Sequence, residues 1–181
     1  YSSNDVREAL KYSINRQQIV DTALSGYGVV GNDHPVPPAS PYFNNELPQR
    51  PYDPDKAKFH LKKAGMDDLS VTLSTSDTVF SGAVDAAVIY QNNAAEAGIN
   101  LDVLRETADG YWSDVWMKKP FFCSTWVMRP TPGLMFSTAW SCDASWPETK
   151  WCNEQFDQIL AASKTETDFE KKKAMMWDLQ E

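Results

Sequence analysis

The spacing of apolar residues along the chain predicts a series of amphipathic helices. In residues 6–24 apolar side chains recur every three or four positions, which indicates two consecutive helices, with Asn15 capping the second and Gly26 following it. Asp53 before Pro54 is typical of a helix start. Further helices are expected over about 54–64, 80–97, 109–118, 132–140, 153–163 and 168–181.

Three segments between these helices have the pattern of strands. Residues 69–75 and 99–104 alternate apolar and polar side chains, and the apolar run 121–127 suits a buried strand. Strands that alternate with helices are typical of an α/β layer. We therefore expect an α/β fold with a mixed, at least partly parallel sheet flanked by helices.

The segment from Tyr27 to Pro51 has no apolar periodicity. Six prolines interrupt it and exclude a regular helix or strand over most of its length. A long irregular segment in a compact domain usually covers a surface or lines a cleft, and we expect one of these roles here.

Composition and charge exclude several classes of partner. At 181 residues the chain is long enough for one domain with a proper core. The formal net charge of −8 argues against nucleic acid as a partner, because such binding needs clustered cations. The basic run Lys171–Lys173 is accompanied by Asp168 and Glu170 and is interpreted as a solvated helix face. No stretch approaches the roughly 18 apolar residues of a membrane span, so direct membrane insertion is not expected.

The cysteines and histidines allow few metal or redox sites. The three cysteines are either all unlinked thiols, or Cys142 is paired with Cys152 while Cys123 stays unlinked. The two histidines, His34 and His60, lie apart from each other and from any cysteine cluster. No metal and no cofactor is expected.

The sequence lacks the common catalytic motifs, so an enzyme is not expected. We find no nucleophile elbow, no paired-histidine zinc motif and no glycine-rich phosphate loop. Two other interpretations remain open. Acidic residues are numerous enough for a carboxylate-based glycoside hydrolase domain. Six of the seven tryptophans fall between residues 112 and 151, which would suit an aromatic-rich carbohydrate-binding module. Of these six, the helical Trp112 and Trp116 are expected to be core residues.

Four stretches resemble the family 5 extracellular solute-binding proteins, the peptide and nickel binders of ABC importers. They are Val6-Arg-Glu-Ala-Leu-Lys-Tyr-Ser-Ile-Asn-Arg-Gln-Gln-Ile-Val20, Tyr52-Asp-Pro-Asp-Lys-Ala-Lys58 with Lys63-Ala-Gly65, Ala97-Gly-Ile99 with the strand after it, and Asn153-Glu-Gln-Phe-Asp157. Together they span nearly the whole chain in the family's order. Asn15 replaces the aspartate that is usual in the family, and either residue caps a helix.

The resemblance implies a fold, a role and a compartment. The chain is similar to the C-terminal lobe of a two-lobed, type II periplasmic binding protein, and residues 1–181 are expected to be this lobe, truncated at both ends. Such proteins bind a peptide or other small solute and deliver it to an ABC transporter permease. The resemblance therefore implies a periplasmic, exported protein, and an oxidising compartment in which Cys142 and Cys152 form a disulfide.

The resemblance also indicates candidate ligand-binding residues. The family's ligand-contacting segment aligns with Trp126 and with the residue three positions later, Arg129; Met128 and Thr131 of the same segment are expected to contribute. Peptide-binding relatives carry an acidic residue at the position of Arg129. A guanidinium there suits a carboxylate or phosphate, so the solute is expected to carry an anionic group.

Overall fold

The structure, a computed structural model, describes residues 3–181. The described chain divides into two compact units. The first comprises the chain up to Val30 together with Arg50–Thr125, and the second comprises Gly31–Gln49 and Trp126–Glu181. Each unit has a hydrophobic core of its own.

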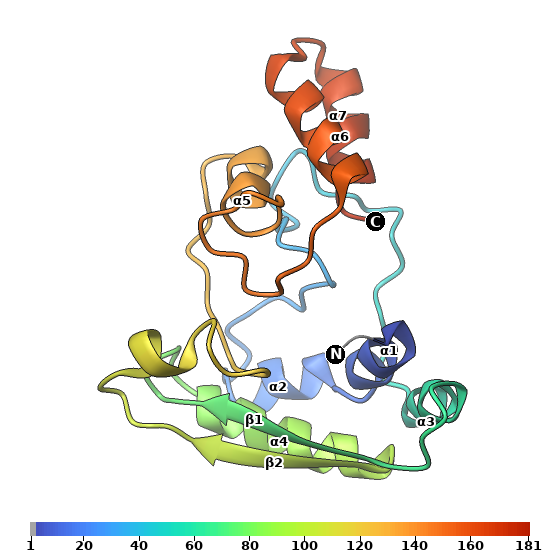
Figure 1. The fold of residues 1–181 in the computed structure, drawn as a ribbon, viewed down its shortest axis with the longest axis vertical. Coiled ribbons are helices and arrows are strands. Elements are labelled where there is room, and N and C mark those ends of the chain that lie inside the picture. Colours follow the sequence, from blue (N-terminus) through green and yellow to red (C-terminus); the bar gives the residue numbers. More distant parts are fainter. Residues whose placement is uncertain (1–2) are drawn as a thin grey trace. The chain divides into compact units, whose positions relative to one another are not determined.

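The first unit is a parallel βαβ arrangement with three more helices. Its elements are α1 (Asn4–Tyr12), α2 (Arg16–Thr22), α3 (Pro54–Lys63), β1 (Leu69–Thr75), α4 (Ala83–Glu96), β2 (Ile99–Arg105) and the π-helical turn η1 (Tyr111–Val115). The strands pair in parallel, with Leu69 opposite Ile99 and Thr75 opposite Arg105. Parallel strands need a crossover, which α4 supplies, and α4 lies along the strand pair (Figure 1).

Local capping explains where the first helices begin. The side chain of Asn15 accepts a hydrogen bond from Gln18 N at 3.0 Å, and Asp53 Oδ1 accepts one from Lys56 N at 2.8 Å. Pro54 occupies the first turn of α3, where a missing N–H costs nothing. The helix starts expected from the sequence are therefore confirmed.

The core of the first unit lies between the strand pair and the helices. Ala9, Leu61, Ile99 and Leu101 are at most 1% exposed. Tyr111 is fully buried, and its hydroxyl donates to Cys123 O at 2.8 Å and lies 3.2 Å from Ser74 O. This side chain thereby ties η1 to β1 and to the segment that follows η1.

The second unit consists of three helices and an irregular segment. The helices are α5 (Pro132–Ala139), α6 (Glu154–Thr165) and α7 (Phe169–Asp178), and α6 and α7 lie side by side (Figure 1). The amide of Gln180 donates to Tyr42 O at 2.8 Å and accepts from Asn44 N at 2.9 Å. Residues 31–49 are thus held against the end of α7, as a surface-covering segment would be.

Two expectations from the sequence are wrong. Residues 121–127 do not form a strand: only Phe122 pairs, with Ser74, and Val127 is 80% exposed. The pairing stops because β1 ends at Thr75, so a parallel neighbour that begins opposite Ser74 has no partner left. Trp112 is not a core residue: it is 41% exposed, whereas its neighbour Tyr111 is buried. The reason is that both residues lie in a π-helical turn, which does not have the α-helical spacing expected from the sequence.

Candidate functional site

A cluster of aromatic and charged side chains surrounds Trp126 in the second unit. The rings of Trp126 and Trp146 are 5.8 Å apart and inclined at 45°. The guanidinium carbon of Arg129 lies 5.8 Å from the Trp126 ring centre and 5.9 Å from that of Trp146. Glu148 Oε2 accepts a hydrogen bond from Trp126 Nε1 at 3.0 Å. We call these four residues the Trp126 cluster.

The environment of Arg129 leaves its N–H donors available to a ligand. Within residues 3–181 the structure records no ion pair for its guanidinium, only the two indole contacts. Cation–π contacts of this kind are worth about 0.5–1 kcal/mol at exposed sites. The edge of the guanidinium, which carries the N–H groups, is the part that pairs with a carboxylate.

The two other predicted site residues have different surroundings. Thr131 is the N-cap of α5, and its Oγ1 accepts a hydrogen bond from Leu134 N at 3.2 Å. Met128 is 72% exposed. The structure therefore brings Trp126 and Arg129 together, leaves Met128 at the surface beside them, and gives Thr131 a helix-capping contact.

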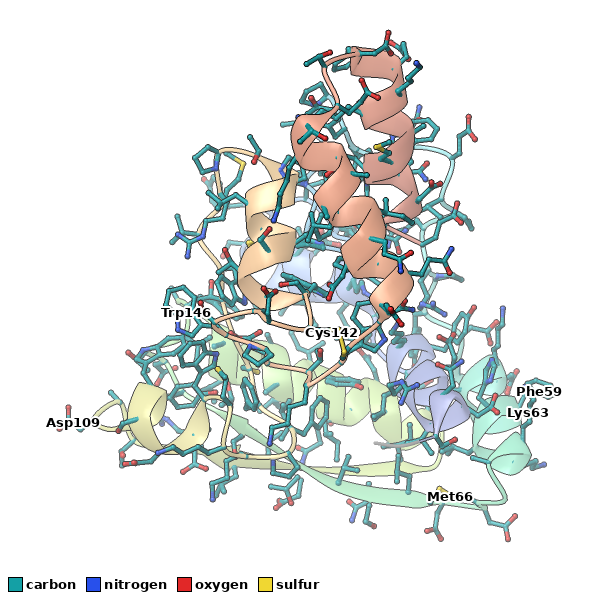
Figure 2. The ribbon with its side chains drawn as sticks, turned by 45° about the horizontal axis from the view of Figure 1, so that its top comes forward. Phe59, Lys63, Met66, Asp109, Cys142 and Trp146 are labelled. Carbon is teal, nitrogen blue, oxygen red and sulfur yellow. A yellow bond between two sulfur atoms is a disulfide. The ribbon has the colours of Figure 1, made fainter. Side chains whose placement is uncertain are left out.

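Sequence reasoning missed Trp146 and Glu148 as partners of Trp126. Both lie on the loop between Cys142 and Cys152, which the structure joins by a disulfide with Cα atoms 4.6 Å apart. Figure 2 labels Cys142 and Trp146, which lie on this loop before α6 in the sequence. The one signal in the sequence was the concentration of tryptophans between 112 and 151.

A second candidate region lies in the first unit, at the carboxyl ends of β1 and β2. A pocket of about 390 Å³ is lined by Ser76, Asp77, Arg105, Glu106, Thr107 and Ala108. Its charges are largely paired: Arg105 contacts Asp77 at 2.5 Å, and Glu106 accepts a hydrogen bond from Ser74 Oγ at 2.9 Å. Ligands of parallel sheets often bind beyond such strand ends. None of the residues predicted as site residues lines this pocket.

The reactive side chains outside these two regions form no metal-binding group within residues 3–181. In the described part of the chain no three His, Cys, Asp or Glu residues are grouped so as to hold a metal ion. Burial raises the pKa of the Cys123 thiol, which keeps it protonated and weakly nucleophilic. Burial lowers the pKa of His34, because it disfavours the charged imidazolium. The Nδ1 atom of His34 accepts a hydrogen bond from Val36 N at 3.3 Å.

The helices found in residues 3–181 are all too short or too polar to cross a membrane.

Solved structures, among them a periplasmic binding protein, have the same fold. DppA from Helicobacter pylori, solved with the peptide STSA, superposes with a TM-score of 0.86 at 22% identity, over 98% of this chain and 36% of that one. NikZ from Campylobacter jejuni, solved with Ni(L-His), gives a TM-score of 0.83 at 23% identity, over 98% and 38%. The fold is therefore the α/β fold of one part of a type II periplasmic binding protein, as the sequence predicted.

The sequence comparison identifies the family. The profile of bacterial extracellular solute-binding proteins, family 5 (middle part), matches residues 1–147. The chain belongs to this family of solute-binding proteins, whose members bind solutes and are not enzymes. The glycoside hydrolase and carbohydrate-binding-module interpretations are not favoured.

Curated relatives are named as binders of glutathione or dipeptides. The glutathione-binding protein GsiB of Salmonella choleraesuis is 29% identical over 200 residues, which cover 100% of this chain and 37% of that protein. GsiB of Escherichia coli O6:K15:H31 is 31% identical over 94% of this chain and 35% of its own length. The dipeptide-binding protein of E. coli K12 is 27% identical over 92% and 33%. The chain thus spans only about a third of the length of these relatives.

Proposed function

We propose that residues 1–181 are the C-terminal lobe of an exported, periplasmic protein that binds a small solute and delivers it to an ABC transporter permease. Family membership supports the binding role. The relatives named for glutathione and dipeptides, and the solved structures with a peptide and with Ni(L-His), support a peptide-like or other small polar solute.

We further propose that the Trp126 cluster contacts this solute and that Arg129 selects an anionic group on it. The observation that carries the proposal is the guanidinium of Arg129, which lies against two indole rings and has no carboxylate partner in residues 3–181. The rings limit its motion, and Pro130 and Pro132 limit the backbone on its C-terminal side, so little conformational entropy remains to be lost on binding.

A purely structural role for Arg129 has less support. In that alternative the guanidinium would neutralise Asp143 or Glu148 on an acidic surface. The described structure shows no such ion pair, and Glu148 is engaged by the indole of Trp126 instead. Met128, exposed beside the cluster, offers an apolar contact to the same solute. Thr131 would then act on the site through the start of α5.

Arg129→Ala in the intact protein tests this proposal. Calorimetry with the dipeptide Met-Leu, with its C-terminal amide and with glutathione measures how much a carboxylate contributes. We expect the wild type to prefer Met-Leu over the amide, and Arg129→Ala to bind Met-Leu at least tenfold more weakly and to lose this preference. Removing one partner of a charge-assisted bidentate pair in a closed cleft typically costs on the order of 2–5 kcal/mol of binding free energy. The melting temperature without solute should stay nearly unchanged.

Arg105→Ala is the matched control. Arg105 is an exposed arginine of the other candidate region, and its side chain contacts Asp77. If Arg105→Ala weakens binding and Arg129→Ala does not, the solute contacts the pocket at the strand ends and the proposal for the Trp126 cluster is wrong. A wild-type protein that binds neither peptide nor glutathione contradicts a peptide-like solute.

A further inference from the structure

The loop between Cys142 and Cys152 is attached to the rest of the second unit along its length. Cys142 N lies 3.2 Å from each carboxylate oxygen of Asp157 on α6, and Trp146 N donates to Thr138 O on α5 at 3.1 Å. The disulfide closes the loop. Trp151, beside the second cysteine, packs edge-on against Phe156 with ring centres 5.1 Å apart. The loop is therefore fixed at its start, its middle and its end.

The segment that carries Trp126 and Arg129 is less well supported by its own backbone. Residues 124–129 belong to no helix or strand, and Val127 and Met128 are 80% and 72% exposed. The contacts that hold the Trp126 ring in this unit are with the fixed loop: the hydrogen bond from its Nε1 to Glu148 and the ring contact with Trp146. The loop thus supplies order that the Trp126 segment lacks.

We propose that the disulfide-closed loop 142–152 is the positioning element of the solute site, with Glu148 fixing the indole of Trp126 and Trp146 supplying the second ring against Arg129. This inference rests on the proposed function, because it assumes that Trp126 and Arg129 contact the solute. Glu148 and Trp146 act through these two residues. Preorganising a site by packing and hydrogen bonds lowers the entropy lost on binding.

Whether Glu148 strengthens or weakens the binding of an anionic solute separates a positioning role from a purely electrostatic one. A carboxylate close to a bound anion repels it, so Glu148 as a mere charge would weaken the binding of an anionic solute. As a positioning residue, Glu148 strengthens that binding through the hydrogen bond that its oxygen accepts. Glu148→Gln keeps an acceptor oxygen without the charge, whereas Glu148→Ala removes both.

The test uses these two variants, the double variant Cys142→Ser/Cys152→Ser and the control Glu154→Ala in the intact protein. Glu154 is an exposed carboxylate just beyond the loop, in the first turn of α6. Calorimetry gives the affinity for Met-Leu. Nuclear magnetic resonance of 15N-tryptophan-labelled protein gives the hydrogen-exchange rate of the Trp126 indole N–H. The signal of this N–H is assigned as the one missing from the spectrum of Trp126→Phe.

We expect Glu148→Ala to weaken Met-Leu binding at least fivefold and to speed exchange of the indole N–H at least tenfold. Glu148→Gln should bind within twofold of the wild type or more tightly, and Glu154→Ala should change neither quantity. The serine double variant should weaken binding at least threefold. If the serine double variant fails to fold, the two Glu148 variants alone decide whether the loop positions Trp126.

Two outcomes overturn the inference. Tighter binding by Glu148→Ala, equal to that of Glu148→Gln, would show that Glu148 acts only as a charge. Unchanged exchange of the Trp126 N–H in Glu148→Ala and in a folded serine double variant would show that the loop does not position this indole. The exchange measurement needs no solute, so it decides the role of the loop even if the wild type binds no peptide and the proposed function fails.

Discussion

At the scale of single residues, Asp5 shows how one side chain joins two helices. Its Oδ1 lies 2.8 Å from His60 Nδ1 and 3.1 Å from Lys63 Nζ, so a carboxylate of α1 contacts two basic side chains of α3. The hydrogen bonds from His60 and then Lys63 hold the pKa of Asp5 below its ordinary value of 3.8. The charged form of Asp5 is therefore favoured in the folded protein.

This lowered pKa predicts a pH dependence of stability with a definite sign. A carboxyl group whose folded pKa is depressed stabilises the protein at pH values above its unfolded pKa, and the contribution disappears as the pH falls through the folded pKa. The stability difference between wild type and Asp5→Asn should therefore be full at pH 6–7 and shrink steadily below a pH of about 3.8. Urea unfolding of both proteins across this range measures it.

Asp55→Asn is the control for this measurement. Asp55 also lies in the first turn of a helix, but its side chain is 94% exposed and its nearest cation, Lys58, is 3.8 Å away. Its substitution should change stability less than Asp5→Asn does at pH 6–7, because exposed ion pairs contribute little. A difference for Asp5→Asn that stays constant from pH 7 to pH 2 would contradict the assigned cause.

At the scale of elements, α3 shows that helical spacing decides burial within one helix. The sequence places Ala57, Phe59 and Leu61 in the same apolar pattern. In the structure Ala57 and Leu61, four positions apart, are 0% and 1% exposed, whereas Phe59 is 59% exposed. Only residues three or four apart share a helix face.

This difference predicts unequal costs for two truncations on α3. Leu61→Ala should lower the free energy of unfolding by about 2–5 kcal/mol, because it removes buried contacts and leaves a cavity. Phe59→Ala should cost less than about 1 kcal/mol, although it removes the larger side chain. Chemical denaturation measures both, and an equal loss for the two variants would show that the exposed face of α3 is packed.

The loop 142–152 gives a second prediction at this scale. With Cys142 linked to Cys152, one of the three cysteines, Cys123, remains a thiol, and Cys123 is half-buried. Thiol titration should count one thiol in the unfolded, unreduced chain and fewer than one in the native protein. A count of three in the unfolded chain would contradict the linkage. Closing so short a loop contributes about 2–3 kcal/mol in the chain-entropy model.

At the scale of the whole molecule, the chain consists of two units that the backbone connects three times, near residues 30, 49 and 125. Each unit packs a hydrophobic core of its own, so we expect the described residues to fold without further segments. The chain nevertheless covers only about a third of its curated relatives. A solute cleft formed with a further lobe would bury the solute from two sides, and under the proposed assignment this chain supplies one of them.

We therefore expect residues 1–181 alone to fold but to bind Met-Leu or glutathione at least a hundredfold more weakly than the intact protein. Circular dichroism and calorimetry on the same preparation measure the two properties. Submicromolar affinity in the 181-residue chain would show that the complete site lies within it, and would contradict the assignment of these residues to one lobe of a two-lobed site.

The sequence by itself determined the local features of this protein. The helix starts at Asn15 and Asp53 and the irregular character of the segment from Tyr27 to Pro51 agree with the structure. So do the strands predicted at 69–75 and 99–104, the second of which extends one residue further, to Arg105. Capping, proline chemistry and apolar periodicity act over a few residues, so the sequence contains them directly. The family motifs indicated the fold for the same reason, since each motif covers at most two consecutive elements of the chain.

Only the tertiary structure decided which distant segments meet. The strand expected at 121–127 failed because its partner β1 ends at Thr75, a fact that no pattern within 121–127 records. Glu148 reaches Trp126 across 22 positions because the disulfide and α5 hold its loop there. Contacts of this kind depend on the packing of other elements, and for that reason the partners of Trp126 could be found only in the folded chain.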